Sequence, residues 1–386
     1  MTKDQAATRR VAIVQRVLTH YRITFYEQLR KVLSDEGIEL TVITGQPSAL
    51  ESTKRDSGHL PWLEEVRNCY WQVGKRQLVW QPYLKSVRSV DLVIVEQASR
   101  LLANYPLLAW RRLSGPKVAW WGHGLNSDSA SASRLGEGIK RLLARRVDWW
   151  FCYTNGTART VEGLGVSSDR LTVVQNAIDT KVISWQRSEI RDEQHAAARA
   201  ELGVGTGPVG LYLGSLYDTK RIPYLIEACD QIRSRLPVFH LIVIGDGPDR
   251  PFLEAAATTR PWLHVLGART GSEMVRYAAL SSVILNPGLV GLSVLDAFAL
   301  GLPMITCDLP YHSPEIEYLL DGQNGLVLAG DTSAAGYGDR VVDLLGNPRL
   351  LEQLSAGALI SSETYTVEGM VDRFATGILM ALEVVR

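Results

Sequence analysis

The sequence predicts an α/β protein made of two doubly wound domains, and three observations support this. At 386 residues the chain is longer than one hydrophobic core usually organises. Short, continuous apolar runs, typical of buried parallel strands, alternate with helical patterns in both halves. The alternation stops between residues 185 and 206, where a charged, helix-favouring stretch ends in the breaker GVGTGP. We therefore predict a first domain at 1–184, a hinge at 185–206 and a second domain at 207–363.

In the first domain one helix, ITFYEQLRKVLSDEG, follows the first strand. The region from residue 46 to 90 has no regular pattern and is left unassigned. The predicted strands are RRVAIVQ, ELTVITG, DLVIVEQ, PKVAWWGHG, DWWFCYT and LTVVQNAID.

In the second domain five strands are separated by helical patterns that begin at IPYLIEACD, FLEAAAT, GSEMVRYAAL and Leu292. One more helix, TVEGMVDRFATGILMAL, ends the chain. The strands are VGLYLGS, FHLIVIGDG, LHVLG, SSVILN and PMITC. Two such domains joined by a hinge are expected to bind a ligand in a cleft at their strand ends.

The composition of the chain argues against several classes of protein. Lys plus Arg equals Asp plus Glu at 41 each, so capture of nucleic acid by bulk charge is not indicated. The four cysteines are far apart in the sequence, which favours reduced thiols over disulfides or a zinc site. The N-terminus is polar and no apolar run reaches transmembrane length. We expect a cytoplasmic protein.

The most informative stretch runs from Asn286 to Leu328. A strand is followed by a glycine-containing loop, a helix that ends at Gly301, and another strand. This unit directs the N–H groups of a helix start toward an anion beyond the strand end. Asp296 lies in the first turns of the helix, where its carboxylate can face the same place. The expected contact residues are Gly288, Leu289, Val290, Gly291, Leu292 and Ser293.

This stretch resembles the donor-binding segment of retaining GT-B glycosyltransferases of the Glu-x7-Glu branch, which includes glycosyltransferase group 1 and family 4. The second acidic position of the motif falls on Asp296, and Gly301 and Pro303 match in spacing. The first acidic position falls on Gly288, so the motif is broken there. The resemblance implies a GT-B fold, a nucleotide-diphosphate sugar as donor (UDP, with GDP or dTDP as alternatives), no bound cofactor or metal, and a final helix at 364–386 that returns to the first domain.

The loop GSLYDTKR after the first strand of the second domain carries Lys220 and Arg221. They are either a solvated pair or ligands of a diphosphate, and a helix start that disfavours cations favours the second reading. Lys220 matches the lysine of the family, whereas Ser215 stands where its phosphate-binding Arg belongs. Further donor contacts by resemblance are Gly214, Gly245, Gly247, Arg269, Thr270, His312 and Glu315, with His312 compensating for Gly288.

On the first domain, His123 follows a strand between two glycines, and by resemblance it touches the donor sugar. Without the resemblance a structural hydrogen bond is equally probable. His20, Tyr21 and Arg22 are predicted as acceptor-side or phosphate contacts, because three polar-tipped residues would be costly to bury unpaired. Glu96, at another strand end, either meets the acceptor or pairs with Arg100.

The sequence thus predicts a glycosyltransferase that moves a sugar to a hydroxyl acceptor, a cell-envelope or lipid-linked glycan, with retention. His123, Lys220 and Asp296 are the principal residues. An epimerase or inverting enzyme, using Glu96 as base, and a catalytically silent binding protein remain alternatives. The basic segment 134–146 and Trp110–Arg112 are either a solvated helix face or a peripheral contact with the inner face of the membrane.

Overall fold

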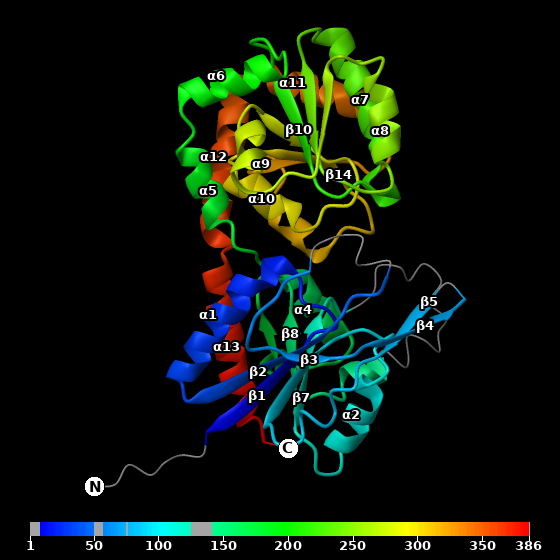
Figure 1. Cartoon of the computed structure of the whole chain (residues 1–386), viewed down its shortest axis with the longest axis vertical. Helices are drawn as coiled ribbons and strands as arrows, with labels where there is room; N and C mark the ends of the chain where they lie inside the picture. Colours follow the sequence, from blue (N-terminus) through cyan, green and yellow to red (C-terminus); the bar gives the residue numbers. More distant parts are fainter. Residues whose placement is uncertain (1–7, 50–56, 75, 125–140, 386) are drawn as a thin grey trace. The chain divides into compact units, whose positions relative to one another are not determined.

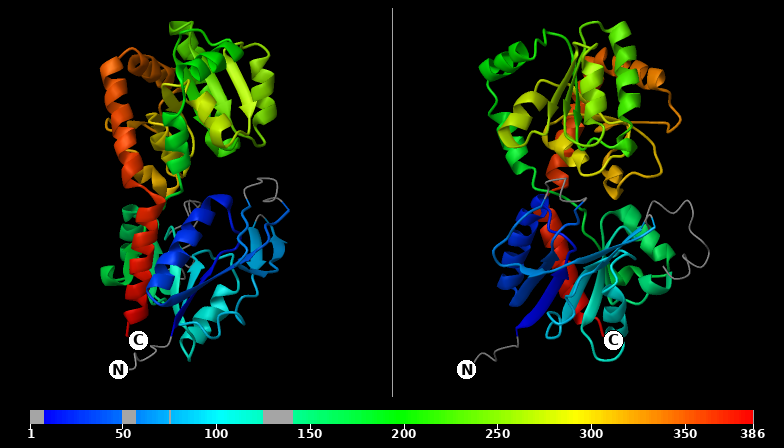
Figure 2. Two further views of the ribbon diagram at one scale, coloured as in Figure 1. Left: turned by 60° about the vertical axis from the view of Figure 1, so that its left-hand side comes forward. Right: turned by 45° about the vertical axis from the view of Figure 1, so that its right-hand side comes forward.

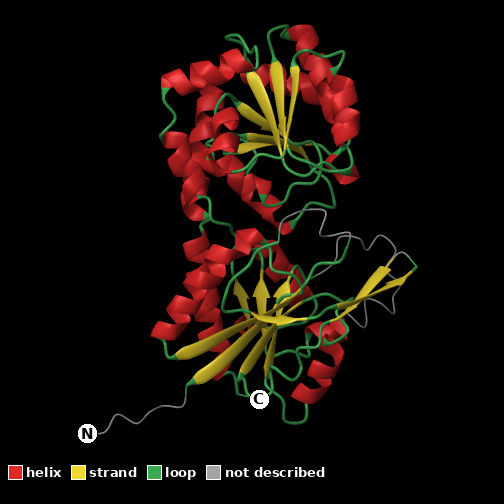
Figure 3. Cartoon of the chain, viewed as in Figure 1, coloured by secondary structure: helices red, strands yellow, loops and turns green. Residues whose placement is uncertain are grey.

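The computed structural model describes residues 8–49, 57–74, 76–124 and 141–385. The chain forms two compact units. The first comprises residues 1–179 together with 367–386, and the second comprises residues 180–366. Each unit is built on a parallel sheet with helices on both of its faces (Figures 1 and 3). The predicted fold class is therefore correct for both units.

The first unit contains a seven-stranded sheet in the order β3-β2-β1-β6-β7-β8-β9, and every pair in it is parallel. Its central strands are almost fully buried, as their continuous apolar runs require. The strands are β1 (Arg9–Val14), β2 (Ile38–Gly45), β3 (Glu64–Val66), β6 (Leu92–Glu96), β7 (Lys117–Gly122), β8 (Trp149–Cys152) and β9 (Leu171–Val173).

The helices of the first unit are α1 (Ile23–Asp35), α2 (Asn104–Arg111), α4 (Asn155–Gly163) and α13 (Val367–Glu383). The chain returns to this unit in α13, which packs beside α1 (Figure 2). Phe374 of α13 stacks on Phe151 of β8 with ring centroids 4.2 Å apart, and it meets Phe25 of α1 edge-on. These buried rings fix α13 on the sheet.

The unassigned region between residues 46 and 90 contains a separate two-stranded hairpin. It consists of β4 (Cys69–Val73) and β5 (Arg76–Trp80), paired antiparallel. The hairpin is not part of the seven-stranded sheet.

The second unit contains a six-stranded parallel sheet in the order β12-β11-β10-β13-β14-β15. Its core lies between the sheet and its helices and includes Tyr212, Phe239 and Tyr337. The strands are β10 (Val209–Leu213), β11 (His240–Ile244), β12 (Leu263–Gly267), β13 (Val283–Leu285), β14 (Met304–Cys307) and β15 (Gly325–Leu328). The helices are α5 (Lys181–Ser188), α6 (Asp192–Glu201), α7 (Ile222–Arg235), α8 (Arg250–Ala257), α9 (Gly271–Ala278), α10 (Ser293–Ala299), α11 (Ala334–Leu345) and α12 (Pro348–Thr364).

The prediction of a hinge at residues 185–206 is wrong. This stretch contains the second half of α5 and all of α6, and both helices belong to the second unit, where they pack on α9. Tyr277 of α9 donates a hydrogen bond of 2.6 Å to Glu201 of α6, and Arg276 pairs with the same carboxylate. The division between the units falls at residues 179 and 180 instead. Charged side chains made the stretch look like a linker, although they are the outer face of packed helices.

Each sheet reverses its strand order once. In the first unit the reversal lies between β1 and β6, and in the second it lies between β10 and β13. The loops that leave neighbouring strands at such a point diverge to opposite faces, so ligands bind there in open α/β sheets. The strand order alone therefore selects the loops after β1, β6, β10 and β13.

Candidate active site

In the second unit three loops meet beyond the carboxyl ends of β10, β13 and β14. We call residues 214–221, 286–292 and 308–315 the switch-point loops. Backbone hydrogen bonds join them: the N–H of Leu289 donates to Thr219 O at 2.9 Å, and the N–H of Ser313 donates to Val290 O at 3.0 Å. Lys220, Gly288, His312 and Glu315 all lie on these loops, so the structure gathers residues that are up to 95 positions apart in the sequence.

Lys220 is the buried cation of this site. It ends the short 3-10 turn Asp218–Lys220 and is only 6% exposed. Its Nζ donates to the carbonyl oxygen of Leu289, and no carboxylate pairs with it in the described part of the chain. Burial lowers the pKa of Lys220 to about 8, so the amine is still mainly charged at pH 7. A buried, unpaired ammonium group is costly unless an anion joins it.

Gly288 explains the broken acidic motif. It is buried against the backbone of Lys220, and a Cβ atom added at Gly288 would lie 2.4 Å from both the carbonyl carbon and the oxygen of Lys220. Real Cβ atoms do not approach backbone so closely, so no acidic side chain fits without moving one of the loops. The glycine thus permits the close contact that holds Lys220 in place.

His312 uses both ring nitrogens inside the protein. Its Nδ1 accepts the N–H of Val290 at 2.9 Å, and its Nε2 lies 2.7 Å from the carbonyl oxygen of Cys307 at the end of β14. This pattern requires a neutral ring with the proton on Nε2. Burial lowers its pKa, which favours the same state. The prediction that His312 recognises sugar hydroxyls would require these bonds to break, and the observed contacts make it a clamp between two switch-point loops.

Asp296 lies in the first turn of α10, as predicted, and is partly exposed. Its carboxylate has no ion pair or side-chain hydrogen bond with any described residue. Burial raises the pKa of Asp296 to about 7, so the group titrates near neutral pH. An acid with a raised pKa at a strand-end site is a candidate for binding or proton transfer.

Two buried polar atoms at the site have no partner among the described residues, and only one of their residues was expected from the sequence. The Oδ1 of Asn286 and the Oγ of Ser293 are buried and have no hydrogen-bond partner. Ser293 was predicted as a donor contact, whereas Asn286 was not predicted to be part of the site. Its position directly after the apolar strand VIL is the signal that could have identified it, because polar residues at strand ends face the switch point.

Arg221 does not point freely into the site. It adopts a left-handed backbone with φ +55°, and its guanidinium lies 4.0 Å from the ring centroid of Tyr224. Its Nη1 is also 3.4 Å from the carbonyl oxygen of Pro287. A left-handed conformation in a non-glycine residue is uncommon and marks a constrained position. Arg221 therefore lies beside the loop 286–292, where its role toward a phosphate stays a prediction.

The glycines after β10 and β11 serve the contact between two loops. A Cβ atom at Gly245 would lie 1.8 Å from Gly214 O, and one at Gly247 would lie 2.2 Å from Leu216 O. The two loops therefore run backbone to backbone, which only glycine allows. Ser215 is exposed between them.

The remaining donor-side candidates are dispersed around this centre. Arg269 lies after β12 and pairs with Glu273 at 2.9 Å, and the adjacent Thr270 is exposed. Glu315 is 2% exposed in the 3-10 turn Pro314–Tyr318 and is part of the interior. Contacts of these residues with a nucleotide stay predictions.

In the first unit Arg22 corrects an expectation. It is 4% exposed, and its guanidinium donates to Asn176 Oδ1 and, at 3.3 Å, to Ala177 O. The same group lies over the ring of Trp121, 5.2 Å from the centroid. Arg22 is thus a core residue that ties the start of α1 to the loop after β9, rather than a group that meets an acceptor. Its polar tip is buried because it is fully engaged.

His20, Tyr21 and Glu96 lie close to the reversal point of the first sheet. The N–H of Arg16 donates to Glu96 Oε1 at 2.9 Å, which joins the loop after β1 to the end of β6. His20 is exposed and Tyr21 is partly exposed. Glu96 is therefore held by backbone at the switch point, and its contact with an acceptor or with Arg100 stays a prediction.

His123 follows β7 and is exposed, with its ring centroid 4.3 Å from that of Tyr153. The surrounding protein and then the charge of Arg22 lower the pKa of His123. The pKa falls from 6.5 to about 4, so the ring is neutral at pH 7. A neutral imidazole can accept a proton or a hydrogen bond there.

A cavity of about 460 Å³ opens beyond β1, β2 and β3 in the first unit. Its walls come from residues 17–18, 44–47, 57–58, 63 and 65–67. The hydroxyl of Thr44 is buried and unpartnered at this cavity, and Gly58 packs on the backbone of His20. A larger cavity of about 700 Å³ lies at the opposite, amino-terminal strand ends, where Arg111 pairs with Asp148. Only the first lies on the edge where α/β sheets bind ligands.

Two further expectations concern metals and membranes. Among the described residues no three His, Cys, Asp or Glu side chains are grouped as a metal would need. The helices in the described ranges all fall short of the length and apolar content of a membrane span. Most of the basic segment 134–146 lies outside the described residues. Arg111, expected on the same surface, is engaged with Asp148.

Comparison with protein families gives two matches. Residues 24–182 match the model described as Glycosyltransferase Family 4, and residues 207–347 match the model described as Glycosyl transferases group 1. Together the matches span most of the chain; the second match lies within the second unit, and the first lies in the first unit apart from its last three residues.

Individual proteins resemble this chain at low sequence identity. The alpha-monoglucosyldiacylglycerol synthase of Acholeplasma laidlawii is 26% identical over 204 residues, which are 51% of this chain and 49% of that protein. The alpha-D-kanosaminyltransferase of Streptomyces kanamyceticus is 24% identical over 311 residues, or 78% and 74% of the two chains. The chain thus spans about half the length of the first relative.

A solved structure of Anabaena HepE, in complex with UDP and glucose, has a TM-score of 0.70 with 13% identity. The superposed region covers 96% of this chain and 99% of the HepE chain. At this identity the likeness shows the fold, which is GT-B with two Rossmann-like domains.

Proposed function

We propose that this chain, a glycosyltransferase of the GT-B fold composed of a family 4 domain and a group 1 domain, transfers a sugar from a nucleotide-diphosphate donor to a hydroxyl acceptor with retention of configuration. The observation that carries the proposal is the buried Lys220 ammonium, which has no carboxylate partner among the described residues and is held at the strand-order reversal of the group 1 domain. A diphosphate would supply the missing negative charge.

Lys220 would act mainly on the leaving group. When the glycosidic bond to the donor breaks, charge grows on the diphosphate, and a cation already fixed in a buried site stabilises that charge without reorganising. In the proposed front-face reaction the departing phosphate also takes the proton of the acceptor hydroxyl. No separate base is then needed. Asn286 and Ser293 offer unsatisfied polar atoms beside the same loops for the sugar or ribose.

UDP is the first choice of donor because a structural neighbour was solved with UDP and glucose. The acceptor would be bound by the family 4 domain, in the cavity beyond β1 to β3 that holds the unpartnered Thr44 hydroxyl, with His20 at its border. The similarity to a monoglucosyldiacylglycerol synthase favours a lipid-linked or glycan acceptor. The enzyme would then work in the cytoplasm at the inner membrane face, with segment 134–146 as one contact.

The test combines binding and turnover. A panel of UDP-, GDP- and dTDP-sugars is screened by thermal shift, and a ligand at 100 times its Kd should stabilise the domain by about 2.7 kcal/mol. Lys220→Ala should abolish the shift, whereas Arg349→Ala, which removes an exposed positive charge from α12, should leave it unchanged. An unaltered shift in Lys220→Ala would contradict the proposal.

Two outcomes would favour the alternatives. Loss of turnover in Glu96→Gln with intact donor binding, or a product of inverted configuration by NMR, would indicate an epimerase or inverting enzyme with Glu96 as base. Donor binding without any turnover across a panel of lipid and glycan acceptors would indicate a silent binding protein. Retention in the NMR product, with full activity of Glu96→Gln, supports the proposed reaction.

A further inference from the structure

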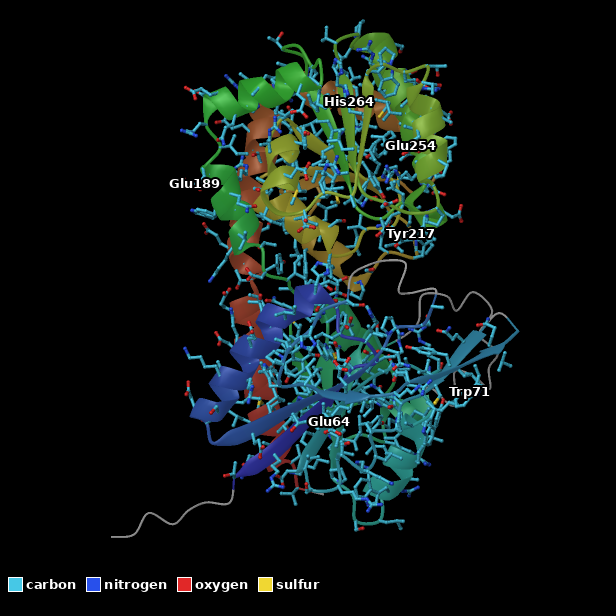
Figure 4. All side chains as sticks on the ribbon, in the orientation of Figure 1. Glu64, Trp71, Glu189, Tyr217, Glu254 and His264 are labelled. Atoms are coloured by element: carbon cyan, nitrogen blue, oxygen red, sulfur yellow. The ribbon has the colours of Figure 1, made fainter. Side chains whose placement is uncertain are left out.

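Two histidines lie on the amino-terminal edge of the sheet in the second unit. His240 is the first residue of β11 and His264 is the second residue of β12, and these two strands are parallel neighbours. The switch-point loops leave the opposite, carboxyl-terminal edge, and Figure 4 shows His264 and Tyr217 of the loop 214–221 at opposite ends of this sheet. The histidine pair is therefore separate from the candidate active site.

The two rings are hydrogen-bonded to each other. His240 Nδ1 lies 2.9 Å from His264 Nε2, and the ring planes are inclined by 19°. One of these nitrogens must donate and the other must accept, so the pair can hold one extra proton without losing the bond, but not two. Burial lowers the pKa of His264 to about 4, and it lowers the pKa of His240 as well. The pair is therefore neutral at pH 7 and gains a proton only when a nearby group stabilises the charge.

Two guanidinium groups flank His240. Arg233 of α7 donates through Nη1 to Phe239 O at 2.9 Å, one residue before His240. Arg199 of α6 donates through Nη2 to Gly207 O at 2.8 Å, just before β10, the strand that pairs with β11. After burial, the charges of Arg233 and Arg199 are the causes that lower the pKa of His240, so both cations are near its ring.

No carboxylate in the described part of the chain forms an ion pair with Arg199 or Arg233. Both side chains are partly exposed, and the hydrogen bonds described for them go to main-chain carbonyls. Other arginines around the same edge each have an acidic partner, in the pairs Arg260–Asp230, Arg235–Asp339 and Arg276–Glu201. The same is true on or beside the helices α8 and α9, which also pack on these strands, in the pairs Arg250–Glu254 and Arg269–Glu273. The histidine pair thus lies beside two positive charges that lack a balancing negative charge.

We propose that Arg199, Arg233 and the His240–His264 pair bind a phosphate-type oxyanion, and that the histidine pair takes up a proton as the anion binds. Guanidinium groups bind tetrahedral oxyanions through N–H donors, and both groups keep donors beyond those used on the main chain. A protonated imidazole adds another charged donor. The two guanidiniums also disfavour a metal cation at this histidine pair, because like charges repel. The inference does not rest on the proposed transfer reaction, since ion binding is measured without donor or acceptor.

NMR of the histidine rings gives a site-specific test. Sulfate is the first probe because it remains a dianion between pH 5.5 and pH 8, and chloride at the same ionic strength is the reference. We expect sulfate to shift the ring signals of His240 and His264, assigned with His240→Gln and His264→Gln, and to raise the apparent pKa of the pair. The signal of His59 in the first unit should not move. Inorganic phosphate and methyl phosphate should act as sulfate does, and the tighter of the two shows whether the free ion or a phosphomonoester is preferred.

Affinities from the same titrations test the two cations. Arg199→Gln and Arg233→Gln should each weaken sulfate binding roughly tenfold, the contribution of a charge-assisted hydrogen bond. The matched control is Arg235→Gln, which removes a neighbouring guanidinium that already pairs with Asp339 and should change affinity less than about twofold. Because a proton is bound with the anion, wild-type affinity should rise up to about tenfold per pH unit as the pH falls from 7 to 5.5. The double variant His240→Gln with His264→Gln should lose this pH dependence.

Circular dichroism checks the folding of each variant, and if one arginine variant does not fold the other still tests the site. The inference is overturned if sulfate and chloride give the same ring shifts, or if the folded arginine variants bind sulfate as tightly as the wild type. It is also overturned if wild-type affinity does not depend on pH. Lys220→Ala should leave the histidine shifts unchanged, so a loss of donor binding with normal ion binding would affect only the proposed transfer reaction.

Discussion

Replacing Asp296 by asparagine tests the electrostatics of the candidate site. The carboxylate lies in the first turn of α10, partly exposed, and no positive group in the described residues offsets its burial. Burial raises its pKa from 3.8 to about 7. Asparagine has nearly the same shape but no charge, so the variant removes the ionisation and little else.

The sign and size of the effect follow from this shift. The folded chain holds the proton more tightly than the unfolded chain, so the protonated carboxyl contributes stability that is complete below pH 3.8 and is lost as the pH rises through 7. A difference of about three pKa units corresponds to about 4 kcal/mol. Because Asp296 keeps some contact with solvent, we expect Asp296→Asn to be more stable than the wild type by about 1–4 kcal/mol at pH 8 and by almost nothing at pH 4.

Urea unfolding between pH 4 and pH 8 measures this difference, with Glu352→Gln on the exposed surface of α12 as the control that should show no such pH dependence. The same samples are then given a nucleotide sugar. Asp296→Asn should gain stability without ligand and lose the ligand-induced shift, since it gives up the charge of a group that we propose binds the donor. A stability difference that is the same at every pH, or a less stable variant at pH 8, would refute the argument.

Three further predictions concern single contacts. Gly288→Ala should lower the free energy of unfolding by about 1–3 kcal/mol and weaken donor binding, because the new Cβ meets the backbone of Lys220. Denaturant titrations measure the change in stability, with Gly163→Ala as the control because nothing lies within 4 Å of a Cβ atom at Gly163. Donor affinity, measured by calorimetry, should be constant below pH 8 and should fall up to tenfold per pH unit above it as Lys220 loses its proton. An affinity that stays constant above pH 8 would contradict the role of Lys220. Arg22→Ala should cost about 2–4 kcal/mol of stability because it removes the buried hydrogen bonds to Asn176 Oδ1 and Ala177 O, while the exposed Arg112→Ala should be neutral. An Arg22→Ala protein of normal stability and poor acceptor affinity would restore the original assignment of Arg22.

Much of the fold could be predicted from the sequence, because its signals are local. A buried parallel strand needs a continuous apolar run, and SSVILN, LHVLG and FHLIVIGDG each contain one at the strand that forms. Glycines after strands marked the loops in the same way. The stretch from 46 to 90 has no such periodicity, and its hairpin became visible only in three dimensions.

Most residues of the candidate site could be predicted from the sequence, but the contacts that each of them makes could not. Lys220 and Gly288 were found by their positions in loops after strands, and His312 by the resemblance to the family. Whether His312 faces a ligand or the loop depends on Val290 and Cys307, and no pattern within a few residues encodes those contacts. Arg22 was misassigned for the same reason, since its partner Asn176 lies 154 positions away.

By itself, the sequence determined an α/β chain with two sheets and the loops at the strand ends. It also showed that Lys220 stands at a helix start, where a cation is normally disfavoured. Only the tertiary structure decided that Gly288 supports the backbone of Lys220, that Arg22 belongs to the core, and that the charged stretch 185–206 packs as helices instead of forming a hinge. The physical reason is range: hydrophobic periodicity acts between neighbours along the chain, whereas burial and hydrogen bonding are settled by residues that only folding brings together.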